Sequence, residues 1–364
     1  MSLIHKIALT LIKGVGDITA KNLLETFGTA EAVFSAKHDQ LIGIEGIGSV
    51  TARHILDTNA LKGAVDQLNF LEKYKINILF YTDAGYPQRL KNCFDAPVLL
   101  YYKGTADLNH VRIVSIVGTR KATSYGLSLC NQLAETLQLY DVLVVSGLAF
   151  GIDVAAHKES LRYQIPTVGV LGHGLDRLYP AVHKQVAQEM LKNGGLLTEF
   201  PPGTVPDKEN FPKRNRIIAG MADVVLVVEA ASKGGALITA EIASSYNRDV
   251  FAFPGRTTDE YSAGCNFLIK TNRAGLINHA KDLAYYMGWE TVNTAVEARQ
   301  TAIPIGLSPH EVCIVTLLGS SQSMRIDELG IKANIPQSKL AFYLLNLEMK
   351  GIIISLPGKV YQLV

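Results

Sequence analysis

The chain is poor in cysteine, with four in 364 residues and no CxxC pair among them. Because Cys93, Cys130, Cys265 and Cys313 are far apart, the sequence indicates neither a zinc ribbon nor a disulfide framework. No run of about 18 uncharged apolar residues occurs, and the amino-terminal segment lacks a cleavable-signal pattern. We therefore expect a cytoplasmic protein in a reducing compartment, with no membrane association.

An excess of charge of either sign is also missing. Lys and Arg number 35 against 33 Asp and Glu, a net charge of +2, which excludes a surface coated in positive charge. Any site for a polyanion must then be a local cluster of basic side chains and backbone N–H groups. Apolar residues reach 48%, which excludes a disordered chain, and the length predicts more than one domain.

Residues 1–75 read as short helices joined by glycine-rich turns. One pattern occurs twice, first at Gly14-Val15-Gly16 and again at Gly46-Ile47-Gly48, each followed four residues later by Ala and then by a basic residue. The pattern is typical of helix-hairpin-helix (SAM-like) domains, whose turns can offer N–H groups to phosphates. A helical module that contacts protein remains an equal alternative.

Residues 76–290 alternate between apolar strands, glycine turns and helices. Apolar strands near 112–117, 141–145, 167–171 and 222–228 indicate an α/β, Rossmann-like, doubly wound and mostly parallel sheet. A linker is expected over 291–306. Residues 307–364 then predict three helices and a two-stranded hairpin, which is a winged helix for contact with either protein or a DNA groove.

Ligands of such a sheet bind beyond the carboxyl ends of its strands, where four segments are expected. The first contains Gly118, Thr119, Arg120 and Ser124. It lacks the second glycine of a dinucleotide fingerprint, so NAD binding is not predicted, whereas an arginine beside helix-start N–H groups suits another phosphate.

The second segment contains Ser146, Gly147 and Phe150. A phenylalanine between glycines at this edge can stack on a base. Asp153 and His157 lie one helical turn apart and allow an acid–base pair with Ser146 as nucleophile. No GxSxG elbow is present, however, and a structural role for Asp153 is favoured.

The third and fourth segments add basic side chains and glycines. Lys213, Arg214, Asn215 and Arg216 are expected in a loop that brings their charges to the cleft of Arg120. Gly234 and Gly235, at a helix start with Thr239 nearby, predict a phosphate cradle. There is no Walker A motif, so ATP hydrolysis is not predicted.

Together these stretches resemble the DNA-processing protein A family. The motifs that carry the resemblance are YPQRL at 86–90, IVGTRKATSYG at 116–126, SGLAFGID at 146–153, GHGLDRLYP at 172–180, PPG at 201–203, FPKRNRIIAG at 211–220, GGALITAE at 234–241 and FPG at 253–255. Asn247 stands where a glycine is common in the family. The resemblance covers nearly the whole chain, although the terminal domains vary within the family.

The resemblance implies a protein that binds single-stranded DNA without sequence preference. It implies protection of incoming strands in natural transformation, loading of a RecA-type recombinase and a homodimer formed through the Rossmann-like domain. Arg120, Phe150 and the Lys213–Arg216 cluster fall on motifs linked with DNA binding in the family. No catalytic residue, metal or cofactor is predicted.

Two alternatives to this function stay open. GGALITAE also resembles the glycine motif of nucleoside-monophosphate phosphoribohydrolases, in which Arg120 and Arg214 would hold a 5′-phosphate and Glu229 or Glu241 would assist cleavage. The other alternative is a nucleotide sensor whose winged helix reads duplex DNA.

Overall fold

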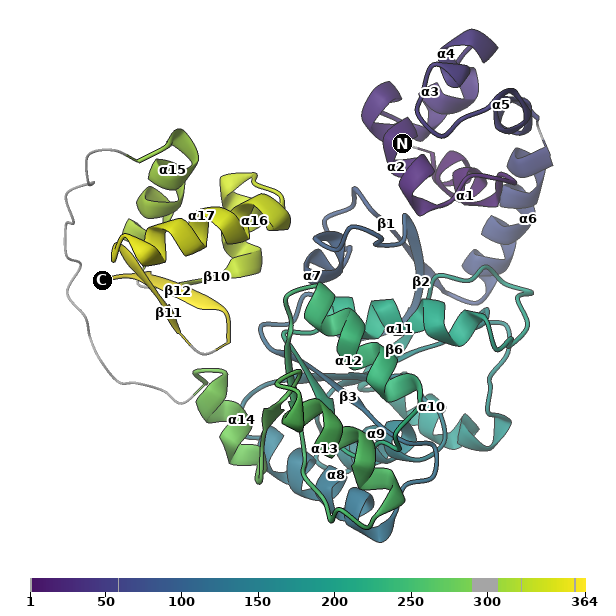
Figure 1. Cartoon of the computed structure of the whole chain (residues 1–364). Coiled ribbons are helices and arrows are strands. Elements are labelled where there is room, and N and C mark those ends of the chain that lie inside the picture. Colours follow the sequence, from purple (N-terminus) through teal and green to yellow (C-terminus); the bar gives the residue numbers. More distant parts are fainter. Residues whose placement is uncertain (1, 58, 290–306, 322, 357) are drawn as a thin grey trace.

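The computed structural model describes residues 2–57, 59–289, 307–321, 323–356 and 358–364. An amino-terminal helical part, a large central α/β part and a small carboxyl-terminal part follow one another along the chain (Figure 1). The linker expected over 291–306 lies outside the described residues. The described residues contain no helix that is long and apolar enough to cross a membrane.

The amino-terminal part confirms the predicted helical hairpins. Gly14 and Gly46 both have positive φ, at +88° and +84°, which allows the tight turns that precede α2 and α5. The two hairpins are in contact with each other. A Cβ placed on Gly14 of the first hairpin would lie only 3.4 Å from the Thr51 hydroxyl of the second. The helices are α1 (Leu3–Leu11), α2 (Asp17–Phe27), α3 (Ala30–Ser35), α4 (His38–Ile42), α5 (Ser49–Leu56) and α6 (Asn59–Lys73).

The central part is built on a nine-stranded sheet with the order β1-β2-β6-β5-β4-β3-β7-β8-β9. Pairing is parallel from β6 through to β9, whereas β1 and β2 form an antiparallel edge, so the expected mostly parallel sheet is confirmed. Its strands are β1 (Asn77–Phe80), β2 (Leu99–Gly104), β3 (Ile113–Val117), β4 (Leu143–Ser146), β5 (Thr167–Val170), β6 (Gly194–Thr198), β7 (Val224–Val227), β8 (Asp249–Ala252) and β9 (Gly275–Leu276).

Helices cover both faces of this sheet because side chains along each strand alternate between them. Ile113 and Val117 pack with α7, α11, α12 and α13, whereas Val114 and Ile116 pack with α8, α9 and α14. The helices are α7 (Gln88–Lys91), α8 (Ser124–Leu137), α9 (Ile152–Arg162), α10 (Lys184–Met190), α11 (Asn210–Met221), α12 (Gly235–Ser245), α13 (Ala263–Lys270) and α14 (Ala280–Tyr286).

The carboxyl-terminal part is a winged helix with one more strand than the sequence predicted. The short strand β10 pairs with β12, so the expected two-stranded hairpin is the larger part of a three-stranded antiparallel sheet. The hairpin can be predicted from its alternating apolar residues, whereas β10 has only two residues, which are too few to show such an alternation. The elements are α15 (Pro309–Gly319), β10 (Met324–Arg325), α16 (Ile326–Ala333), α17 (Gln337–Met349), β11 (Ile353–Leu356) and β12 (Val360–Leu363).

Ion pairs join the winged helix to the central part. Arg248, which is buried just before β8, pairs with Asp327 in the first turn of α16. Lys359 in the wing lies 3.9 Å from Asp249, and Arg325 lies 3.4 Å from Asp223. These contacts fix one edge of the winged helix against the amino-terminal ends of β7 and β8.

Candidate functional site

A small crevice lies at the carboxyl ends of the parallel strands, where the sequence predicts ligand binding. Its free volume is about 20 Å³, which is too small to enclose a nucleotide. We call it the carboxyl-edge surface. It is lined by Arg120, Gly147, Ala149, Phe150, Leu171, Gly172, Tyr179, Pro180, Phe211 and Arg214.

Three of the ten residues that line this surface are aromatic. Phe150 and Tyr179 are 46% and 48% exposed, which is unusual for large apolar rings beside a core. Tyr179 lies 6.2 Å from Phe211 between ring centroids, and the guanidinium of Arg120 lies 5.3 Å from the Phe211 ring. Exposed rings beside an arginine can stack on bases and hold the adjoining phosphates.

Phe150 is held in place from one side. Its ring meets the ring of His183 edge to face at 5.1 Å between centroids, and the Nδ1 of His183 lies 3.0 Å from the Leu148 carbonyl oxygen. The loop between β4 and α9 is thus tied to the segment before α10. Phe150 stays 46% exposed beside this support, so part of its ring is accessible to a flat ligand.

Arg214 lies beneath the surface as a buried support. Its Nη1 donates to the carbonyl oxygens of Gly147 and Val170, at 2.5 and 2.6 Å. Burial lowers the pKa of Arg214 to about 10, while the nearby Asp153 carboxylate acts in the opposite direction. The Arg214 side chain therefore joins the carboxyl ends of β4 and β5. Its positive charge is already offset in part by the carboxylate of Asp153.

The structure corrects the predicted convergence of the basic cluster. Residues 213–216 lie on helix α11 and not in a loop, and successive residues of a helix point in different directions. Lys213 is exposed and Arg214 is buried, while Asn215 makes a long contact of 3.4 Å with the Gly235 carbonyl. Arg216 faces the amino-terminal part instead, where it pairs with Asp17 at 3.1 Å and with Glu199.

The hydrogen-bonding groups of the segment after β3 are also largely used in contacts within the chain. The carboxylate of Glu229 accepts hydrogen bonds from the backbone N–H and the hydroxyl of Thr123, at the start of α8. The backbone N–H of Thr119 donates to the Glu229 carbonyl oxygen at 2.7 Å. Gly118 and Thr119 therefore shape the turn, while Ser124 and Arg120 are exposed beside it.

Two hydroxyl groups that were predicted to contact the ligand form hydrogen bonds within the chain instead. The Ser146 hydroxyl donates to the Ile116 carbonyl at 2.6 Å, and the Thr239 hydroxyl donates to the Gly235 carbonyl at 2.9 Å. Both side chains are buried, so neither is offered to a ligand as the sequence suggested. Gly234 and Gly235, by contrast, are exposed where α12 begins, as the cradle prediction requires.

Asp153 and His157 are not accessible to a substrate, as the acid–base alternative would require. His157 is fully buried, its Nδ1 lies 2.7 Å from the Thr167 hydroxyl, and burial lowers its pKa to about 3. Burial raises the pKa of Asp153, and the charge of Arg214 lowers it. Across the described part of the chain, no three His, Cys, Asp or Glu side chains gather as metal ligands.

Sequence reasoning missed Tyr179, Phe211 and His183 as members of the surface. Tyr179 and Phe211 stand in the motifs at 172–180 and 211–220, but apolar rings beside a core are usually buried. Their position in segments that follow the strands β5 and β6 was the available signal.

Comparison with known proteins connects this geometry to one family. The model of the family described as DNA recombination-mediator protein A matches residues 77–288, and a helix-hairpin-helix motif matches residues 7–63. The chain is 35% identical over 285 residues to protein Smf of Synechocystis, which covers 76% of this chain and 71% of that protein. It is 41% identical over 201 residues to DNA processing protein DprA of Streptococcus pneumoniae, covering 55% and 71% of the two chains.

Solved structures give the same result. The X-ray structure of DNA processing protein A from Streptococcus pneumoniae aligns with a TM-score of 0.65 at 32% identity, over 77% of this chain and 96% of that one. A structure of the Helicobacter pylori protein, which concerns that protein's single-stranded DNA binding mode, aligns with a TM-score of 0.52 at 29% identity. That alignment covers 57% of this chain and 93% of the Helicobacter pylori chain.

Proposed function

Because the chain belongs to the DNA recombination-mediator protein A family, which includes the DprA and Smf proteins, we propose that it binds single-stranded DNA without sequence preference. The observation that carries the proposal is the carboxyl-edge surface, with the exposed rings of Phe150 and Tyr179 beside Arg120 and Phe211. Every base has a flat face, so stacking tolerates any sequence, at about 1–3 kcal/mol per stacked base.

We propose that the strand crosses this surface with bases on the rings and phosphates near Arg120. Exposed Lys213 and Ser124, and the glycines at the start of α12, then lie along its route. Arg214 and Asp153 act from below by fixing the loops. We assign Arg216 a structural role, because its ion pair with Asp17 joins the central part to the amino-terminal part.

The protein acts as a homodimer in this proposal. One surface with so few cations makes few phosphate contacts, and two copies on one strand gain affinity through a high effective concentration. Ile238, Phe267 and Leu276 are exposed apolar residues on α12, α13 and β9, which supports a contact through the central part. Sedimentation of the wild type and of Phe267→Asp measures it, with a shift toward monomer expected for the variant.

The remaining roles follow from the family alone. We propose that residues 1–75 and 307–364 are accessory domains around a DNA-binding domain over 76–290. We also propose that the bound strand is protected from nucleases and passed to a RecA-type recombinase. A recombinase nucleation assay on coated single strands tests this step, and inhibition in place of stimulation would contradict it.

The enzyme alternative is less well supported by the placement of its carboxylates. Glu229 is 3% exposed and caps α8, whereas Glu241 is exposed and lies 3.9 Å from Arg273. Neither carboxylate lines the carboxyl-edge surface. Incubation with nucleoside monophosphates and measurement of free base tests the alternative, and steady turnover would replace the binding proposal.

The duplex-reading alternative is weakened by the winged-helix contacts. The start of a recognition helix and the wing usually approach DNA. Here Gln337 and Ser338, at the start of α17, line a cleft against the central part, and Lys359 in the wing pairs with Asp249.

Titration of single- and double-stranded oligonucleotides at two salt concentrations tests the proposed function. We expect tighter binding of single strands of any sequence, with affinity that falls as salt rises. Preference for one duplex sequence would favour the sensor instead.

A further inference from the structure

A buried histidine lies behind one of the two exposed rings of the carboxyl-edge surface. His173 comes after β5 and is 1% exposed, whereas Tyr179, six residues later, is 48% exposed. The Nε2 atom of His173 lies 3.1 Å from the backbone nitrogen of Tyr179. His173 does not line the surface itself, so any influence of this histidine on a bound strand has to pass through Tyr179.

The two partners of His173 fix the position of its proton. Its Nδ1 lies 2.9 Å from the carbonyl oxygen of Gly174, which can only accept, so Nδ1 carries the hydrogen. Nε2 is then bare and accepts the N–H of Tyr179. Burial lowers the pKa of His173 from its ordinary value of 6.5, so the ring is neutral at pH 7 and keeps this acceptor.

The base of the loop between His173 and Tyr179 is anchored to the segment that follows β6. The N–H of Gly174 donates to the Thr204 carbonyl oxygen at 3.1 Å. A Cβ on Gly174 would lie 2.6 Å from the carbonyl oxygen of Pro201, so the two segments are in close contact. The bond from His173 extends this support to the far end of the loop, which carries Tyr179.

The Tyr179 ring lies beside Phe211, which is itself well supported. The two ring centroids are 6.2 Å apart, with 37° between the ring planes. Phe211 packs on Gly172, where a Cβ would lie 3.1 Å from its Cδ1 atom, and against the guanidinium of Arg120 at 5.3 Å. Because Tyr179 is nearly half exposed, packing holds its ring less firmly, and the direction of the backbone decides where the ring lies.

We propose that His173 is a positioning residue for strand binding: by accepting the Tyr179 N–H, it holds the Tyr179 ring beside Phe211, where a base can stack. The inference rests on the proposed function, because it assigns a role within the same surface. His173 acts before the strand arrives, by removing freedom that the ring would otherwise lose on binding.

Two substitutions separate the two hydrogen bonds of His173. His173→Gln places an amide oxygen where Nε2 lies, so the glutamine can still accept the Tyr179 N–H. His173→Asn places its amide at the position of Nδ1, so the asparagine keeps the bond to Gly174 and loses the bond to Tyr179.

Fluorescence anisotropy with a single-stranded oligothymidylate measures the effect of each substitution on affinity. We expect His173→Gln to bind about as tightly as the wild type. His173→Asn should bind about 2- to 10-fold more weakly, the equivalent of one hydrogen bond. A wild type that binds the strand no better than His173→Asn does would overturn the proposal and leave the proposed function intact.

A double-mutant cycle with Tyr179→Ala distinguishes positioning from a general loss of structure. Tyr179→Ala should weaken binding about 5- to 150-fold, the equivalent of one stacked base. Because His173 acts through this ring, adding His173→Asn to Tyr179→Ala should weaken binding no further. A general loss of structure would weaken binding in both backgrounds, and that result would overturn the positioning role.

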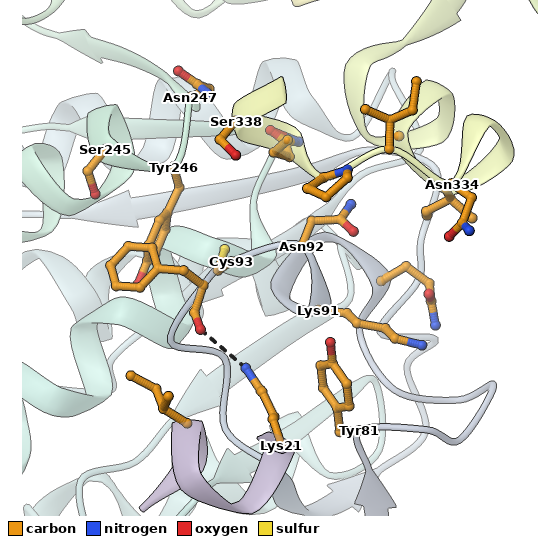
Figure 2. Close-up of a pocket in the computed structure, with 18 of the residues that line it drawn as sticks. Lys21, Tyr81, Lys91, Asn92, Cys93, Ser245, Tyr246, Asn247, Asn334 and Ser338 are labelled. Carbon is orange, nitrogen blue, oxygen red and sulfur yellow. Dashed lines mark hydrogen bonds between the residues drawn. The ribbon is translucent and has the colours of Figure 1, made fainter. Parts of the chain in front are cut away.

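Tyr81 provides a control tyrosine outside the surface. It lines the cleft between the central part and the winged helix, and none of the described residues that line this cleft also lines the carboxyl-edge surface. Figure 2 shows the Tyr81 ring with Lys21 and Lys91 beside it, whose Nζ atoms lie 4.9 and 5.2 Å from the ring centroid. Tyr81→Ala should bind the strand as the wild type does, and a loss equal to that of Tyr179→Ala would contradict the placement of Tyr179 on the strand path.

Amide hydrogen exchange tests the bond itself without DNA. In protein made with isotope-labelled tyrosine, the magnetic resonance signal of the Tyr179 amide is identified by its absence in Tyr179→Ala. We expect slow exchange of this amide in the wild type and in His173→Gln, and faster exchange in His173→Asn. Equal exchange in the three proteins would overturn the proposal. Failure of the wild type to bind single strands would instead refute the proposed function, and with it the role of His173 in binding, even when the exchange pattern is as expected.

Discussion

Arg214 occupies the space that any side chain at position 147 would need. A Cβ on Gly147 would lie 2.5 Å from the Cζ of Arg214, while the Nη1 of the same arginine donates to the Gly147 carbonyl. Glycine is thus required here for close packing against a guanidinium and not for a turn. The loop that carries Phe150 begins at this contact.

Substitution of Gly147 should therefore affect both stability and binding. Gly147→Ala forces Arg214 out of its place, and we expect a loss of about 2–3 kcal/mol in the free energy of unfolding. Denaturant unfolding measures the loss. Gly319→Ala is the control, because a Cβ on this last residue of α15 would meet only Leu363, at an ordinary contact distance of 3.7 Å. Equal stability of the two variants would show that the Gly147 site relaxes freely.

Arg120 should contribute charge to strand binding. Arg120→Ala removes an exposed guanidinium next to the Phe211 ring, and we expect about tenfold weaker binding of single strands. The salt dependence should also flatten, by about 0.7 in the logarithmic slope for each phosphate that is no longer neutralised. Fluorescence anisotropy at several salt concentrations measures both quantities. An unchanged slope in a folded variant would remove Arg120 from the phosphate path.

Phe150 should contribute stacking and not charge. Phe150→Ala is expected to weaken binding about 5- to 150-fold, the equivalent of one stacked base, with the salt slope nearly unaltered. Tyr285→Ala removes a 65% exposed ring of α14 outside the surface and serves as the control. A large change in slope for Phe150→Ala would argue against stacking.

Stability should fall in mild acid because of a buried histidine. Burial lowers the pKa of His157 to about 3 from an ordinary value of 6.5, so the unfolded chain binds a proton between these pH values that the folded chain does not. The free energy of unfolding should decline as the pH falls below about 6.5, by up to about 1.4 kcal/mol per pH unit from this group. Burial also lowers the pKa of His173, which acts in the same direction.

His157→Asn isolates this contribution. The asparagine amide, at the position of the histidine Nδ1, can still bond to the Thr167 hydroxyl but does not titrate, so the decline should become shallower. Chemical unfolding at pH 7, 6 and 5 compares the two proteins. Parallel curves would mean that another group causes the acid loss.

Sequence patterns alone were enough to predict the parallel sheet, the helical hairpins, the winged helix and the edge at which the motifs gather. These follow from local patterns, namely apolar runs, glycine spacing and capping residues, which act within one element. Arg120 and Phe150 were found because they stand in the turns that follow β3 and β4, and such turns reach the ligand edge.

Which side chains of that edge face outward depends instead on how the distant segments pack together. Residues 213–216 looked like one basic patch, but their helix points Arg214 inward to Gly147 and Arg216 toward Asp17. The same holds for Glu229, whose carboxylate caps α8. Local patterns cannot report such contacts, because they depend on distances between residues that are far apart in the chain.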